Sequence, residues 1–105
     1  MEQIFHLIAL LGEKYHADKI VLFGSRARGD HKERSDIDLA IYGISEKDQS
    51  SFWSDIDDLP TLLEFDLVHI TPDTNPELIQ NIEKDGVELM DKLHEKYNYL
   101  KEAVK

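Results

Sequence analysis

Apolar residues recur every three or four positions at the start of the chain, at Ile4, Leu7, Ile8, Leu11 and Tyr15. This spacing places them on one face of an amphipathic helix, which we predict over residues 2–15. Gly12 lies off the pattern and is expected to lower the stability of that helix. A second helix is predicted behind Ser45, which together with Asp48 resembles a capping box. Pro60 is expected to end this second helix.

Two further helical patterns follow in the second half of the chain. Helical spacing of Leu78, Ile79 and Ile82 predicts one helix, and Gly86 is its expected C-terminal stop. Residues 91–105 carry a last apolar stripe, formed by Leu93, Tyr97, Leu100 and Val104. This stripe predicts a final helix or a fraying tail, which could pack on the core, contact a partner or support self-association.

Short apolar runs rich in β-branched and aromatic residues predict strands at residues 19–23, 37–42 and 65–70. Residues 87–90 fit a short fourth strand. Alternation of these strands with the predicted helices indicates an α/β (α+β) fold, with one small mixed sheet flanked by helices. A length of 105 residues is typical of one domain, so we expect a single domain over residues 1–105.

Composition narrows the class of protein. The chain holds 22 acidic and 12 basic residues, a net charge of −10, which opposes generic binding to nucleic acids or to anionic membranes. There is no cysteine, so disulfides and thiolate metal sites are excluded. A hydrophobic fraction of 41% is too high for a disordered chain. With neither a signal peptide nor a long apolar run, the protein is expected to be cytoplasmic.

Gly24 and Ser25 directly follow the first predicted strand, and Arg26 and Arg28 come next. A glycine at this point allows the backbone to approach a ligand closely. A helix that begins at Ser25 would present free N–H groups to a phosphate, and the hydroxyl and the two arginines would add donors. An ordinary turn after a strand is the alternative.

Asp36 and Asp38 lie two residues apart around the start of the second predicted strand. Residues at this spacing point to the same face of a sheet, so the two carboxylates repel each other. A divalent cation such as Mg²⁺ or Mn²⁺ would relieve the repulsion. Two aspartates on a solvent-facing strand are the alternative. Asp66, in the third predicted strand, could add a third carboxylate, or it could instead discourage pairing at a sheet edge.

The letters Ser-Asp-Ile-Asp occur twice, at residues 35–38 and at residues 54–57. The second copy lies in a helical pattern, where residues i and i+2 diverge around the axis. We therefore interpret its acidic residues as a solvated helix face, formed by Asp55, Asp57 and Asp58. The histidines show no metal-binding spacing and are interpreted as structural or surface residues; they are His6, His16, His31, His69 and His94.

The Gly-Ser turn and the three aspartates together indicate a protein family more specifically than any one of these motifs does. Gly24-Ser25, a gap of ten residues, Asp36-x-Asp38 on a strand and Asp66 on a later strand resemble the DNA polymerase β-type nucleotidyltransferase superfamily. The longer string, Gly-Ser-Arg-Ala-Arg-Gly and then Ser-Asp-Ile-Asp-Leu-Ala, is similar to the small members of that superfamily, the minimal nucleotidyltransferases (MNT). The resemblance covers residues 20–70, and the flanks match only in length and order.

The resemblance implies Mg²⁺-dependent transfer of AMP from ATP to a hydroxyl group, with Mn²⁺ as a substitute for Mg²⁺. It implies that the nucleotide is held by Gly24, Ser25, Arg26 and Arg28. It implies that two metal ions are bound by Asp36, Asp38 and Asp66, which are also the catalytic residues. Asp66 would in addition help to activate the acceptor hydroxyl.

The resemblance also implies a partner. Larger relatives carry a second domain for the acceptor, and a chain of this length leaves no room for one. Minimal nucleotidyltransferases typically work with a helical HEPN-type protein, and in many such pairs the MNT antitoxin adenylylates a tyrosine of the HEPN RNase toxin. An acidic antitoxin would suit a basic partner. The alternatives are the catalytic subunit of a two-component small-molecule (antibiotic-type) nucleotidyltransferase, and an antitoxin that acts by binding alone.

Overall fold

Four strands of the described part of the chain form one mixed sheet in the order β3-β2-β1-β4. The structure is a computed structural model that describes residues 1–92. The strands are β1 (Lys19–Phe23), β2 (Ile37–Tyr42), β3 (Phe65–Ile70) and β4 (Val87–Asp91). β1 pairs antiparallel with both β2 and β4, whereas β2 and β3 run parallel and are joined through a helix, as a parallel connection requires.

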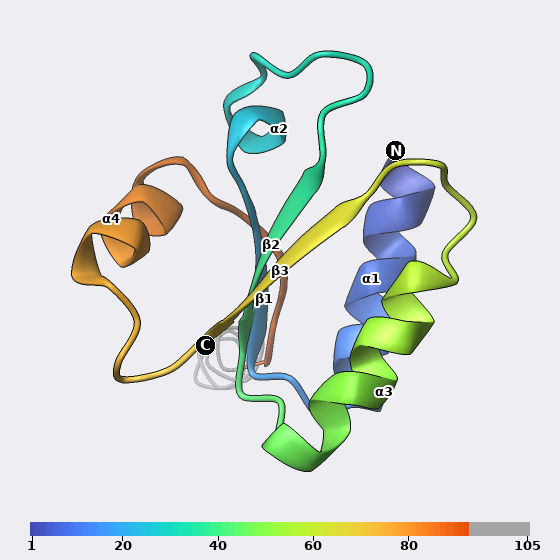
Figure 1. Cartoon of the computed structure of the whole chain (residues 1–105), viewed down its shortest axis with the longest axis vertical. Coiled ribbons are helices and arrows are strands. Elements are labelled where there is room, and N and C mark those ends of the chain that lie inside the picture. Colours follow the sequence, from blue (N-terminus) through green and yellow to red (C-terminus); the bar gives the residue numbers. More distant parts are fainter. Residues whose placement is uncertain (93–105) are drawn as a thin grey trace, which may run out of the picture.

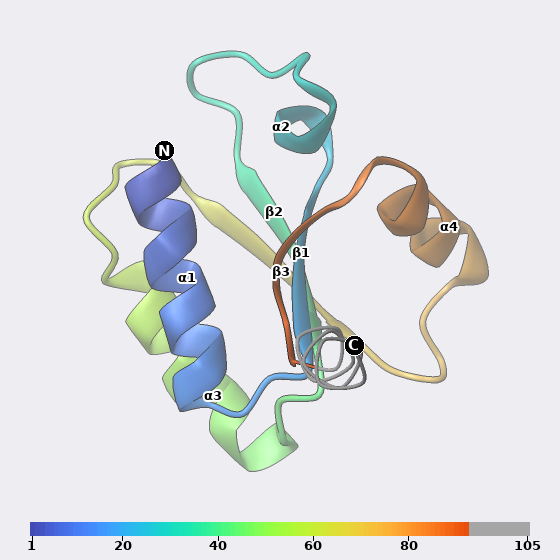
Figure 2. The same cartoon turned by 180° about the vertical axis from the view of Figure 1, so that it is seen from behind.

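Helices cover both faces of the sheet, as Figures 1 and 2 show from opposite sides. Helices α1 (Glu2–Lys14) and α3 (Glu46–Asp57) lie together on one face, and α4 (Pro76–Asp85) lies on the other. The short helix α2 (Ser25–Arg28) stands at one end of the sheet, directly after β1. The predicted mixed sheet with flanking helices is therefore confirmed.

The main core lies between the sheet and the helix pair α1 and α3. Alternate residues of a strand point to opposite faces, and in β2 one set of residues is fully buried against this pair, namely Ile37, Leu39 and Ile41. Phe52 and Ile56 of α3 meet them at the spacing that the helical pattern predicted. The periodicity of the sequence thus determines which side of each element enters this core.

A smaller apolar cluster lies on the other face of the sheet, beneath α4. It is centred on Val21, Ala40 and Ile82, which are all buried. Asp38 precedes Ala40 by two residues, so its side chain lies on this second face, toward the end of the sheet where α2 stands. The polar candidates and this smaller core therefore share one face.

The structure adds to or corrects three local predictions. Gly12 is buried, and an added Cβ there would overlap the side chains of Met90 and Ile20, so α1 packs closely on the sheet at this point. Gly86 ends α4 as predicted, with an extended backbone, and an added Cβ would overlap the Ile82 carbonyl. Ser45 precedes α3, yet its hydroxyl donates to the Asp48 carboxylate (2.9 Å) instead of capping a backbone N–H.

The predicted fourth strand is confirmed, and it continues through Asp91. Strand pairing with β1 therefore occupies the first position that the apolar stripe had assigned to a final helix. The rest of that predicted helix, residues 93–105, lies outside the described residues. Among residues 1–92, every helix is too short or too polar to cross a membrane.

Candidate active site

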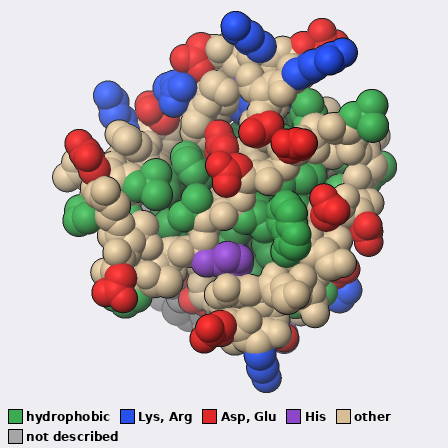
Figure 3. Space-filling model, in the orientation of Figure 1, with side chains coloured by type: hydrophobic (Ala, Val, Ile, Leu, Met, Phe, Trp, Pro, Cys, Tyr) green, Lys and Arg blue, Asp and Glu red, His purple; other side chains and the backbone are tan. Residues whose placement is uncertain are grey.

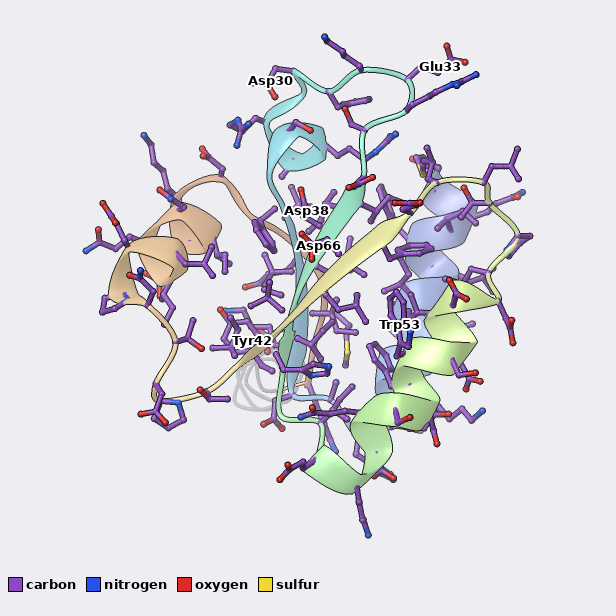
Figure 4. All side chains as sticks on the ribbon, viewed as in Figure 1. Asp30, Glu33, Asp38, Tyr42, Trp53 and Asp66 are labelled. Carbon is purple, nitrogen blue, oxygen red and sulfur yellow. The ribbon has the colours of Figure 1, made fainter. Side chains whose placement is uncertain are left out.

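Two carboxylates meet where β2 and β3 run side by side. Asp38 and Asp66 are directly opposite each other in the parallel register of these strands, and Figure 4 shows both side chains near the end of the sheet that carries α2. Asp38 is half-buried and Asp66 is exposed. Parallel pairing therefore brings together two aspartates that are 28 positions apart in the sequence.

The surroundings of Asp38 disfavour its charged form. Burial raises the pKa of the Asp38 carboxyl above its usual value, and the negative charges of Asp66 and Asp36 raise the pKa further. A hydrogen bond with Asp66 acts in the same direction, while the positive charge of Arg28 opposes the shift. The site therefore concentrates negative charge in a place that is partly shielded from water.

Asp36 lies one residue before β2 and is exposed. It is near enough to affect Asp38 electrostatically, but no three acidic or histidine side chains among residues 1–92 are arranged so that together they could hold a metal ion. Facing carboxylates with a third close by are nevertheless the hard oxygen donors that Mg²⁺ and Mn²⁺ prefer. The donor chemistry around Asp38 therefore fits a divalent cation.

Gly24 joins β1 to α2 and backs directly onto Asp38. Its backbone adopts φ 75°, ψ −158°, a conformation that favours glycine, and a Cβ at this position would overlap the Asp38 carboxylate. Ser25 begins α2, in which the N–H groups of Ala27 and Arg28 donate to the Gly24 carbonyl (3.1 and 3.2 Å). The Gly-Ser turn and the strand carboxylate are thus in direct contact, although they are distant in sequence.

The two arginines of α2 make different contacts. Arg26 donates from Nε to the Ser35 carbonyl (2.9 Å) and from Nη2 to the Glu33 carbonyl (3.1 Å), so it holds the loop that leads into β2. Arg28 is exposed, and its Nε donates to the Asp30 carboxylate at 3.2 Å. Arg26 is therefore engaged in positioning the segment before Asp36, while Arg28 remains at the surface.

The second Ser-Asp-Ile-Asp copy lies in α3. Asp57 and Asp58 are exposed, as predicted. The interpretation of Asp55 as merely solvated is wrong, because its Oδ2 accepts hydrogen bonds from Tyr15 (2.6 Å) and Lys14 (2.9 Å). These two bonds lower the pKa of the Asp55 carboxyl. Asp55 therefore ties α3 to the end of α1.

The interpretation of His69 as a structural residue is confirmed. It points away from the Asp66 face and packs edge-on against Phe52, with ring centroids 6.4 Å apart. Burial lowers the pKa of its imidazole, so this group favours the neutral form.

Sequence reasoning missed one group of residues beside the carboxylates. Trp53 of α3 and Leu62 of the following loop are exposed, and Leu62 is completely so. Trp53 shares a surface hollow with Asp66, and Leu62 shares another with Asp36. The available signal was that Trp53 falls outside the apolar stripe of its own helix, which Phe52 and Ile56 form.

Comparison with known proteins now identifies the class. Residues 6–95 match the family described as "Polymerase beta, Nucleotidyltransferase". The chain is also 37% identical over 78 residues to a candidate protein adenylyltransferase of Methanocaldococcus jannaschii, a match that spans 72% of this chain and 80% of that protein. The chain therefore belongs to the polymerase beta nucleotidyltransferase family, and it is a nucleotidyltransferase.

Solved structures with the same fold support this assignment of architecture. One is a crystal structure of a toxin–antitoxin with AMP-PNP, with a TM-score of 0.66 and 22% identity, covering 96% of this chain and 83% of that chain. Another is a toxin–antitoxin MntA-HpeT mutant with two Asp-to-Glu substitutions, with a TM-score of 0.67 and 20% identity over 95% and 83% of the two chains. At these identities the likeness concerns the fold.

Proposed function

We propose that this protein transfers AMP from ATP to a hydroxyl group, and that the acceptor is a tyrosine of a partner HEPN RNase toxin, which the transfer inactivates. The observation that carries the proposal is the pairing of Asp38 with Asp66 on adjacent strands, with the Gly24 turn packed against Asp38. This arrangement supports the proposal because it concentrates carboxylates directly beside the backbone of the Gly-Ser turn.

Each residue has a role in this proposal. Asp38 and Asp66 would hold Mg²⁺, with Asp36 as a further carboxylate close by, and the bound ion would neutralise charge on the triphosphate and align it. In this proposal Gly24 and Ser25 would contact the phosphates.

The reaction itself needs a base for the acceptor. Asp66 is exposed, so an acceptor can reach it, and its carboxylate would accept the hydroxyl proton. The hydroxyl oxygen then bonds to the α-phosphorus, the bond from that phosphorus to the oxygen bridging to the β-phosphate breaks, and pyrophosphate leaves.

The identity of the acceptor is supported by the relatives and by charge. The Methanocaldococcus jannaschii relative is named for protein adenylyl transfer, and two structures that share the fold are toxin–antitoxin proteins, one of them with AMP-PNP. A net charge of −10 would favour association with a basic protein such as an RNA-cleaving toxin. We accordingly propose an antitoxin role for this chain.

Intact-mass spectrometry tests the proposal. The protein is mixed with ATP, Mg²⁺ and the product of the adjacent gene, and the Asp36→Asn/Asp38→Asn double variant is the control. We expect the partner to gain the mass of one or more AMP units with the wild-type protein only. If the partner is inactivated equally well by the double variant without any gain in mass, neutralisation is by binding alone and the transfer proposal is wrong.

A further inference from the structure

The outer edge of β3 is unpaired in the part of the chain that the structure describes, because β3 is the last strand of the sheet on that side. In a parallel pair, alternate residues direct their backbone groups toward the partner strand and away from it. Ile37 N–H donates to the Glu64 carbonyl (2.9 Å) and Ile37 is in register with Phe65. The backbone groups that face outward are therefore those of Phe65, Leu67 and His69.

A hollow runs along this edge between β3 and α3. Its lining residues come from both elements and are Trp53, Phe65, Asp66, Leu67 and His69. Trp53 is 44% exposed although it is a large aromatic residue, and Figure 4 places it on the side of α3 that is turned to β3. The hollow therefore combines a row of backbone donors and acceptors with an aromatic wall, which are the two parts of a strand-binding groove.

The same edge reaches the candidate active site. Asp66 belongs both to the hollow and to the pair with Asp38. Asp36 and Glu64 are also exposed, in a neighbouring hollow that they share with one basic residue, Arg34, so acidic residues are in excess there. Figure 3 shows acidic side chains gathered on this face between hydrophobic ones. The surface thus favours a ligand that is itself positively charged and partly apolar.

We propose that the outer edge of β3 binds an extended, basic segment of the acceptor polypeptide as an additional strand. This inference rests on the proposed function, since the segment is the one that carries the hydroxyl to be modified. Successive side chains of an added strand point to opposite faces. One set would pack on Trp53, and the other would lie on the face of Asp66 and Asp38, where a hydroxyl-bearing side chain meets the carboxylates.

Amide hydrogen exchange tests the edge directly, with the product of the adjacent gene as the probe. On its addition we expect exchange at the amides of Phe65, Leu67 and His69 to slow by about tenfold or more, as new strand bonds form. The matched controls are the amides of Asp66 and Val68, which already face β2 and should change little. Unchanged exchange at the three outward amides overturns the proposal. Slowing that depends only on the concentration of this protein assigns the edge to a second copy and also overturns it.

Substitution of Trp53 provides a second test with a functional readout. We expect Trp53→Ala to raise the KM for the adjacent-gene protein roughly tenfold or more, as for a central interface tryptophan. Transfer to N-acetyltyrosinamide, which is too small to span the groove, should be unchanged. Leu10→Ala is the matched control, because Leu10 is 46% exposed and lines a separate hollow between α1 and α3.

The two proposals fail in different ways. Equal KM values for Trp53→Ala and Leu10→Ala would overturn the docking proposal and leave adenylyl transfer intact. Failure of the wild-type protein to modify either acceptor would overturn the proposed function, and amide exchange would still decide whether the edge binds the partner.

Discussion

The two Ser-Asp-Ile-Asp segments of this chain have the same letters and opposite electrostatics. In both, the isoleucine is fully buried, as Ile37 in the first and Ile56 in the second. In the first segment, the pKa of the second aspartate, Asp38, is raised by burial and by neighbouring carboxylates. In the second segment, the pKa of the first aspartate, Asp55, is lowered by hydrogen bonds from Tyr15 and Lys14. The comparison shows that partners across the fold, and not the local string, determine what an aspartate does.

The largest expected difference between the copies is in catalysis. Asp38→Asn should reduce AMP transfer by at least about 10²-fold, because the substitution removes a charge that would hold the metal and the transition state. Asp57→Asn, at the equivalent position of the helical copy, should leave the rate unchanged. The measurement is the initial rate of AMP incorporation into the adjacent-gene product. Equal rates for the two variants would remove the functional distinction between the copies.

The next largest expected effect is on stability, and it concerns the contact between Gly24 and Asp38 of the first Ser-Asp-Ile-Asp segment. Gly24→Ala should destabilise the protein by about 1–3 kcal/mol, since it combines an unfavourable φ with overlap onto the Asp38 carboxylate. Gly29→Ala is the matched control, because Gly29 also has a positive φ but has open space around it, and it should cost about 1 kcal/mol. Urea unfolding compares the two, and equal losses would contradict the close contact between Gly24 and Asp38.

Stabilisation by divalent cations should depend on the first Ser-Asp-Ile-Asp segment and not on the second. A saturating excess of Mn²⁺ or Mg²⁺ should raise the melting temperature of the wild-type protein, by the equivalent of about 2.7 kcal/mol at a concentration one hundred times the Kd. Asp38→Asn should lose this increase, and Asp57→Asn should keep it. Differential scanning fluorimetry with and without EDTA measures the shift. An increase that survives in Asp38→Asn would place the cation elsewhere.

The smallest expected effect is a pair of opposite pH dependences in the metal-free protein. A raised folded-state pKa means that charged Asp38 lowers stability. The stability that Asp38→Asn gains relative to wild type should therefore grow as the pH rises from the unfolded-state pKa through the folded-state pKa of Asp38, and it should level off above the folded-state pKa. A lowered folded-state pKa means that Asp55 stabilises the protein above its unfolded-state pKa. The small deficit of Asp55→Asn should therefore vanish as the pH falls through the folded-state pKa.

Melting temperatures of the wild-type protein and both variants between about pH 3 and pH 7 test these signs, over a range that spans the ordinary carboxyl pKa values. Parallel curves for the two variants would contradict the opposite shifts of Asp38 and Asp55.

Much of the fold could be predicted from hydrophobic spacing. The strands 19–23, 37–42 and 65–70 agree with β1, β2 and β3, because short apolar runs with β-branched and aromatic residues favour the extended conformation. The sequence also predicted the strand that carries Asp38 and the strand that carries Asp66, but it left open whether those two strands are neighbours. The bonds of Asp55 and the packing of Gly12 could not be predicted, since each depends on a partner from a distant element.

By itself, the sequence determined the elements, the buried faces and the string of residues that resembles a nucleotidyltransferase, because periodicity and turn residues act locally. Only the tertiary structure decided that Asp38 meets Asp66, that Gly24 packs on Asp38 and that Arg26 holds the loop before Asp36. It also decided that β3 is the outermost strand on its side of the sheet within residues 1–92, with Trp53 beside it. The physical reason is that strand order and register are collective properties of the packed sheet, which no single segment specifies.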